Sequence, residues 1–182
     1  MRHAVTRGLL LLLCLSTPPL ARSAPRAIPA LDSDAYAALL TEHRGKVVLV
    51  SFWATWCKPC RYEIPGLSSI HQSYDAADVA VVAVSVDNDL GRLQRFVSEQ
   101  GLAYPVYQGD LGLKRDQGAF IIPMTLVYSP DGALAERHVG YVAPQQLEDD
   151  VLRHLPPAAG LPDSPEPAGT LAQNLVGGKH PR

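Results

Sequence analysis

The sequence is poor in cysteine, in charged residues and in basic clusters, and each shortage excludes a class of protein. Three cysteines among 182 residues are too few for a disulfide-framework domain or an all-cysteine zinc site. Charged residues make up 19% of the chain against 47% hydrophobic residues, which excludes general disorder. The formal net charge is −2 and no basic run is longer than a pair, so nucleic acid is not expected as a partner. The length suits one domain.

The first 23 residues have the pattern of a secretory signal peptide. A basic start is followed by an apolar run at 8–15, which is too short to cross a membrane because a spanning helix needs roughly 20 residues. Ala21 and Ser23 provide the small residues of a cleavage site. An uncleaved anchor is the alternative. Cleavage would remove Cys14, and the sequence then predicts a periplasmic or otherwise exported protein that does not span the membrane.

The last residues, 156–182, have the composition of a linker. Six prolines and four glycines occur among these 27 residues, and no aromatic residue does. Such a segment has little apolar surface to bury, so we predict a disordered, solvated tail. The folded domain is therefore expected at 24–155.

Within that domain, predicted strands and helices alternate. Continuous apolar, β-branched runs predict strands buried on both faces at 47–52 and 79–85. The complete set of predicted strands is 47–52, 79–85, 125–128 and 134–139, and the predicted helices are 35–40, 59–74 with a kink near Pro65, 90–100, and a last one from Pro144. Buried strands joined by a helix form a parallel unit, whereas the turn at 130–132 predicts an antiparallel hairpin. An α/β sandwich with a mixed sheet follows.

The ends of two helices are marked by capping residues. Ser33 and Asp34 are candidates for the N-terminal cap of the first helix, because short polar side chains accept hydrogen bonds from free backbone N–H groups. Gly101 closes the helix at 90–100.

The chemistry of the chain is concentrated in Trp56-Cys57-Lys58-Pro59-Cys60, between the first buried strand and the helix that follows it. A thiolate is the attacking species in disulfide exchange, and a helix N-terminus favours the negative charge. Two intervening residues place Cys60 one helical turn after Cys57. Cys57 is therefore predicted to attack a partner's disulfide, and Cys60 to resolve the mixed disulfide that results.

The Cys-x-x-Cys spacing has two other interpretations. Half of a zinc site is one, but the chain has no second ligand pair, so no metal is expected. A structural disulfide is the other, although so short a loop removes little chain entropy. A chaperone or copper-handling module that binds metal through the two cysteines remains an open alternative from a different functional class.

The residues around this motif resemble the thioredoxin superfamily. The stretch from Val48 to Pro65 carries the resemblance, and the glutamate and proline after the second cysteine, Glu63 and Pro65, are similar to those of exported TlpA/ResA-like thiol–disulfide oxidoreductases. Ile122-Pro123, just before a predicted strand, falls where the superfamily has its cis-proline loop.

The resemblance implies a three-layer sandwich with a mixed central sheet and helices on both faces. It also implies a Cys57–Cys60 redox disulfide, a cis Ile122–Pro123 bond opposite it, and substrate contacts from Trp56, Ile122, Pro123 and Met124. A monomer without a cofactor is expected, with protein thiols and disulfides as partners and a membrane protein as the electron donor. Some members of the branch serve cytochrome c maturation.

Glu63 can also be analysed from its position alone. On a helix, residues 57, 60 and 63 recur at every third position, so Glu63 shares a side with the two cysteines. A carboxylate buried beneath a dithiol would have a raised pKa and could move a proton to or from Cys60. The alternative is a solvent-facing glutamate that favours an early helical turn through the helix dipole.

The direction of electron flow depends on the residue before the second cysteine. DsbA-like oxidants carry a histidine there that stabilises the thiolate, whereas this chain has Pro59. Proline supplies neither charge nor an N–H donor, so the disulfide is not pushed toward reduction. A reductant is predicted, with an oxidase or isomerase of the same fold as the alternative. A peroxidase is disfavoured, because residues 54–56 do not supply the proline and threonine that peroxiredoxins use.

Overall fold

A computed structural model describes residues 27–156. The predicted signal peptide and, apart from Pro156, the predicted tail lie outside these residues. Among the described residues, no helix is both long enough and apolar enough to cross a membrane.

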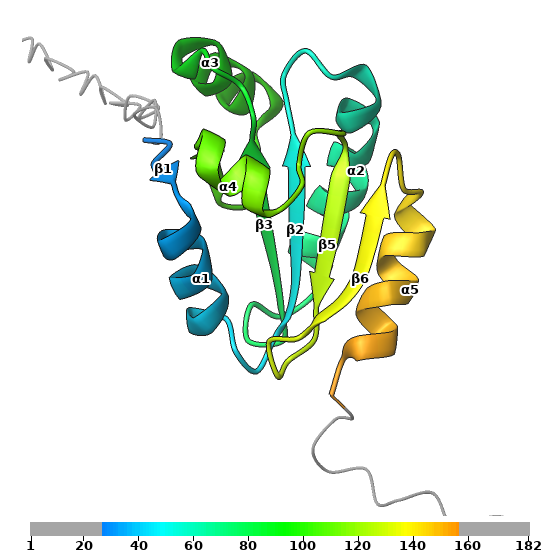
Figure 1. The fold of residues 1–182 in the computed structure, drawn as a ribbon. Coiled ribbons are helices and arrows are strands. Elements are labelled where there is room, and N and C mark those ends of the chain that lie inside the picture. Colours follow the sequence, from blue (N-terminus) through cyan, green and yellow to red (C-terminus); the bar gives the residue numbers. More distant parts are fainter. Residues whose placement is uncertain (1–26, 157–182) are drawn as a thin grey trace, which may run out of the picture.

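Residues 27–156 form a mixed sheet of six strands (Figure 1). Four strands run parallel in the order β1, β4, β3, β2, and β5 and β6 continue the sheet antiparallel. Their bounds are β1 Ala30–Leu31, β2 Val47–Trp53, β3 Val79–Ser85, β4 Val106–Gly109, β5 Met124–Tyr128 and β6 Leu134–Val139. The central strand β2 is buried along its whole length, as its unbroken apolar run predicts.

Helices cover both faces of this sheet (Figure 1). On one face lie α1 (Ser33–Glu42) and α4 (Leu111–Asp116), whose buried side chains pack against alternate residues of β2 and β3. On the other face lie α2 (Lys58–Ser73), α3 (Leu90–Gln100) and α5 (Pro144–His154). Alternate strand residues point to opposite faces, so two hydrophobic clusters form. The predicted three-layer α/β sandwich is confirmed.

Individual elements agree with the prediction to different degrees. The strand at 79–85 and the helix at 90–100 are confirmed, and Gly101 closes that helix with a left-handed φ of 62°. The predicted cap of α1 is wrong, because Asp32 is the N-cap and its side chain accepts a hydrogen bond from the N–H of Ala35. The prediction also lacks β1, β4 and α4.

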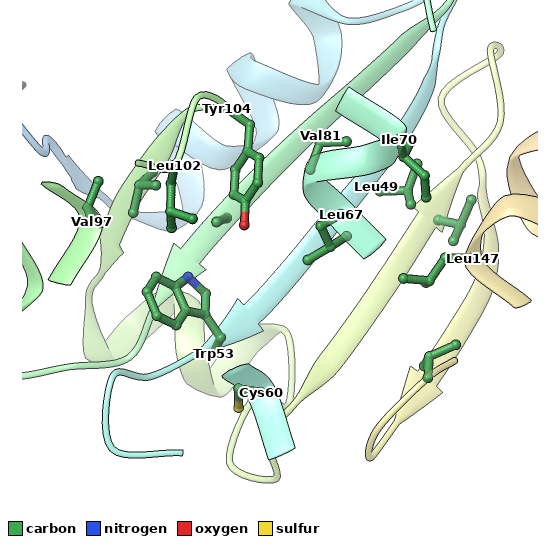
Figure 2. Close-up of a cluster of buried hydrophobic side chains, with 14 of the residues drawn as sticks. Leu49, Trp53, Cys60, Leu67, Ile70, Val81, Val97, Leu102, Tyr104 and Leu147 are labelled. Atoms are coloured by element: carbon green, nitrogen blue, oxygen red, sulfur yellow. The ribbon is translucent and has the colours of Figure 1, made fainter. Parts of the chain in front are cut away.

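One hydrophobic cluster connects the core to the cysteines (Figure 2). Trp53, at the end of β2, and Cys60, in the first turn of α2, both belong to it. The same face holds α2 and α5 close together: a Cβ added to Gly66 of α2 would lie 3.0 Å from Cβ of Pro144, the first residue of α5. This close packing fixes where α5 lies relative to the residues after Cys60.

Candidate active site

Cys57 lies at the N-terminus of α2 and caps it. The chain leaves the sheet at Trp53, passes through a short loop and enters the helix at Lys58. Sγ of Cys57 accepts a hydrogen bond from the backbone N–H of Cys60 at 3.3 Å. The sulfur therefore lies where free N–H groups and the helix dipole stabilise a negative charge.

Cys57 and Cys60 form a disulfide, with an S–S distance of 2.01 Å and 5.3 Å between the two Cα atoms. Both cysteines are buried, with Cys57 5% exposed and Cys60 2% exposed. The predicted pairing is confirmed. Cys57 is the slightly more exposed of the two residues.

A buried aspartate, which the sequence analysis did not identify, holds the loop before Cys57. Oδ2 of Asp87 accepts a hydrogen bond from the backbone N–H of Thr55 at 2.8 Å, and Oδ1 accepts one from the Thr55 hydroxyl at 2.7 Å. The hydroxyl of Ser85, the last residue of β3, donates to Asp87 at 2.8 Å. Asp87 therefore fixes the residues of the motif to the neighbouring strand.

Replacing Asp87 with asparagine should lower the free energy of unfolding by about 2–3 kcal/mol. The volume stays the same, but the amide cannot accept all three hydrogen bonds, and bonds to a charged group contribute about 1.5–3 kcal/mol. The matched control is Asp89→Asn, which changes an exposed cap of α3 and should cost less than about 1 kcal/mol. Urea unfolding at pH 7 measures both values. Equal values for the two variants would contradict a role for Asp87 in holding the loop.

Glu63 is buried, at 1% exposure. It lies on α2 one turn after Cys60, and its Oε1 accepts a hydrogen bond from the backbone N–H of Val142 at 2.7 Å. Oε2 is 3.4 Å from the hydroxyl of Thr125 on β5. The alternative of a solvent-facing glutamate is therefore excluded.

The surroundings of Glu63 favour its neutral form. Burial raises the pKa of Glu63 to about 7, against the lowering effects of the hydrogen bonds from Val142 and Thr125 and of the charge on His138. A carboxyl group with a pKa near neutrality can both accept and release a proton under ordinary conditions.

The loop before β5 contains the cis peptide bond that was predicted between Ile122 and Pro123. The Pro123 carbonyl accepts a hydrogen bond from the N–H of Gly140 at 2.8 Å, and Ile122 packs against the cluster that contains both cysteines. Met124 requires a correction. Its side chain is 1% exposed and packs in the opposite cluster, where its sulfur lies 3.2 Å from the Arg137 guanidinium, so it does not reach the partner surface.

Exposed aromatic and apolar side chains lie in the segments next to the disulfide. Trp56, directly before Cys57, is 63% exposed. Phe120 and Ile121, which precede the cis peptide bond, are exposed too. On the α2 side, a pocket of about 400 Å³ is lined by Lys58, Arg61, Tyr62 and Gln100. These side chains offer both apolar and polar contacts to a partner.

Metal-binding side chains do not gather at this site. Within residues 27–156, no group of three or more histidine, cysteine, aspartate or glutamate side chains is placed to hold a metal ion.

Comparisons with known proteins agree with this geometry. The profile of the AhpC/TSA family matches residues 23–137. The chain is 33% identical over 112 residues to the thioredoxin-like protein YneN of Bacillus subtilis, covering 60% of the chain and 65% of YneN. It is 29% identical over 133 residues to the thiol-disulfide oxidoreductase ResA of Halalkalibacterium halodurans, covering 71% of the chain and 76% of ResA. The match thus spans a little under two thirds of YneN.

A solved structure has the same fold. It is a thiol:disulfide interchange protein of the thioredoxin family from Chlorobium tepidum TLS, with a TM-score of 0.57 and 27% sequence identity. The match covers 63% of this chain and 83% of that one.

Proposed function

Because the chain belongs to the AhpC/TSA family, we propose that it is a thiol–disulfide oxidoreductase that reduces disulfides of exported proteins. The observation that carries the proposal is the Cys57–Cys60 disulfide at the N-terminus of α2 with the buried Glu63 one turn further on. The names of the relatives, a thiol-disulfide oxidoreductase and a thiol:disulfide interchange protein, support the same reaction class.

The first step is attack by Cys57. In the reduced protein its thiolate bonds to one sulfur of the partner's disulfide, and the partner's second sulfur leaves as a thiolate that takes up a proton. A mixed disulfide joins the partner to Cys57. The helix N-terminus stabilises the thiolate before the attack, and the lower accessibility of Cys60 makes Cys57 the attacking residue.

The second step is resolution by Cys60. Its thiol loses a proton, its sulfur bonds to Sγ of Cys57, and the partner's remaining sulfur leaves as a thiolate. Glu63 accepts the proton, since it lies one turn after Cys60 and its pKa is about 7. Two electrons pass to the partner, which ends as a dithiol, and the protein ends as the Cys57–Cys60 disulfide.

The partner binds next to the cis-proline loop. Main-chain groups before Pro123 pair with an extended segment of the partner, in the manner of an added strand. Trp56 provides an exposed aromatic surface, and Ile122 packs against the cluster that contains both cysteines. The protein acts as a monomer and needs no cofactor, because the electrons are held by the two sulfurs.

The reaction runs toward reduction of the partner. Thioredoxin and DsbA differ by about 150 mV in reduction potential, or roughly 7 kcal/mol, and much of this reflects how strongly the attacking thiolate is stabilised. Pro59 adds no charge to that thiolate. In an oxidising compartment such a reductant needs an external electron source, for which a membrane protein is proposed. Apocytochrome c is one substrate that this proposal includes.

Equilibration of the protein with redox buffers of known potential tests the direction. We expect a reduction potential below about −180 mV, nearer that of thioredoxin, together with reduction of insulin disulfides when dithiothreitol is the donor. A potential above about −180 mV would assign an oxidase or isomerase instead. Absence of insulin reduction, with Cu(I) retained by the reduced protein through gel filtration, would favour the copper-handling alternative.

A further inference from the structure

A contact between a histidine and a buried aspartate lies on the same face of the sheet as Glu63, between β6 and α5. Oδ2 of Asp150 lies 2.7 Å from Nε2 of His138, and Asp150 has no exposed surface. Its other oxygen accepts hydrogen bonds from Gln146 and Arg153, each at 3.0 Å. These contacts fix the Asp150 side chain, and Asp150 in turn orients the His138 ring.

The register of the sheet places His138 next to Thr125, a residue that also contacts Glu63. His138 on β6 is directly opposite Thr125 on β5, and paired residues of antiparallel strands have their side chains on the same face, about 5 Å apart. The Thr125 hydroxyl is the group that lies 3.4 Å from Glu63. Glu63 and His138 are therefore both neighbours of Thr125, on the face that α2 and α5 cover.

The segment after β6 also contacts Glu63. Val142, four residues after His138, donates its N–H to Glu63 at 2.7 Å, and the close approach of Gly66 to Pro144 packs α5 against α2. His138 retains partial contact with solvent, with 23% of its side chain exposed. His138 thus lies between the solvent and the buried site.

We propose that His138, held by Asp150, is a positioning residue whose charge favours the carboxylate form of Glu63. The proposal rests on the proposed function, because it concerns the residue to which that function gives the proton of Cys60. When His138 is protonated, its charge stabilises the Glu63 carboxylate, which can then accept a proton. Without that charge, only the hydrogen bonds from Val142 and Thr125 oppose the effect of burial, and Glu63 holds its proton more tightly.

The other charged groups around His138 come from three elements. Glu63 faces it from α2, Asp150 from α5, and β5 contributes only the neutral Thr125. Arg153 and His154 of α5 contact Glu136 of β6, two positions before His138. Arg153 also bonds Asp150. Of these groups, His138 is the one whose charge acts on Glu63.

Carbon-13 NMR of the Glu63 carboxyl group in the full-length oxidised protein tests this directly. The resonance is identified by its loss in Glu63→Gln. We expect His138→Gln, which keeps a hydrogen-bonding side chain but loses the charge, to raise the midpoint of the Glu63 titration by about 1 pH unit. His138→Lys restores the charge and should leave the midpoint at or below that of the wild type. His43→Gln, at the C-cap of α1 across the sheet, is the matched control and should leave the Glu63 midpoint unchanged.

A reciprocal measurement covers the case in which a His138 variant does not fold. Coupling between two sites acts equally in both directions. Glu63→Gln should therefore lower the midpoint of the His138 imidazole titration by the same amount by which His138→Gln raises that of Glu63. A His138 titration that is the same in the wild type and in Glu63→Gln would overturn the proposal, as would an equal Glu63 shift in His43→Gln.

This outcome is separable from that of the proposed function. The titrations are made on the oxidised protein without a substrate, so failure to reduce insulin would refute the function and leave the coupling measurable. Conversely, active protein with an unshifted Glu63 in His138→Gln would refute the coupling alone.

Discussion

Replacing Cys57 with serine is expected to reduce the rate of disulfide reduction to that of the uncatalysed reaction. A serine hydroxyl does not attack a disulfide, and the remaining thiol of Cys60 lies deeper in the core, at 2% exposure. Reduction of insulin with dithiothreitol as the electron donor measures the loss. Circular dichroism of the same sample verifies that the variant is folded.

Cys60→Ser is the matched control, because it removes the other sulfur of the same disulfide. This variant keeps the attacking thiolate at the helix N-terminus, so it should release one thiol per molecule from a disulfide substrate and then stop as a mixed disulfide on Cys57. Mass spectrometry of the trapped species identifies the joined partner. Equal residual turnover in the two variants, or trapping on Cys60 in Cys57→Ser, would contradict the assigned order of attack.

The second large effect is expected for Glu63→Gln, on the pH dependence of the free energy of unfolding. The pKa of Glu63 is raised from 4.5 to about 7 in the folded protein, mainly by burial. The folded state therefore binds this proton more tightly than the unfolded state does. The contribution of Glu63 is fully present below pH 4.5 and is lost as the pH rises through about 7, by about 3 kcal/mol in total.

The direction of this pH dependence can be measured by comparing the wild type with the variant. The free energy of unfolding of the wild type, minus that of Glu63→Gln, should fall by about 3 kcal/mol between pH 4 and pH 8, because the glutamine does not titrate. Urea unfolding of the oxidised proteins measures this difference. In the oxidised form Cys57 and Cys60 are joined as a disulfide, so their thiols do not contribute to the pH dependence of the folded state. Glu99→Gln, at an exposed position on α3, should follow the wild type at every pH. A difference that rises with pH, or none, would contradict a raised pKa at Glu63.

An element of the fold was predictable from the sequence where its own residues carry the pattern of a strand, a helix or a helix end. The strand at 79–85 is a continuous apolar run, and Gly101 ends α3 in a conformation that glycine adopts easily, so both were located correctly. β1 has two residues, β4 has four and α4 has six, which is too short for a periodic pattern. The parallel strands β1 and β4 owe their position to pairing with distant strands, and this pairing leaves no local trace in the sequence.

The site residues were likewise predictable only where the sequence pattern is local. The Cys-x-x-Cys spacing and the third-residue recurrence at Glu63 are local, so both could be found in advance. The groups that hold Glu63 could not, because Thr125 and Val142 are 62 and 79 residues away. Asp87 is a single aspartate after a strand, and only its contact with Thr55, 32 residues earlier in the chain, distinguishes it from other aspartates.

The cap of α2 has a consequence for the backbone during turnover. The acceptor that caps this helix is Sγ of Cys57, the atom whose bonding changes in each step. A thiolate accepts a hydrogen bond more strongly than a neutral sulfur does, so the N–H of Cys60 is held more firmly in the reduced protein than in the disulfide form. The first turn of α2 therefore stiffens and loosens with the oxidation state, and hydrogen exchange at a single amide should report the redox state of the whole molecule.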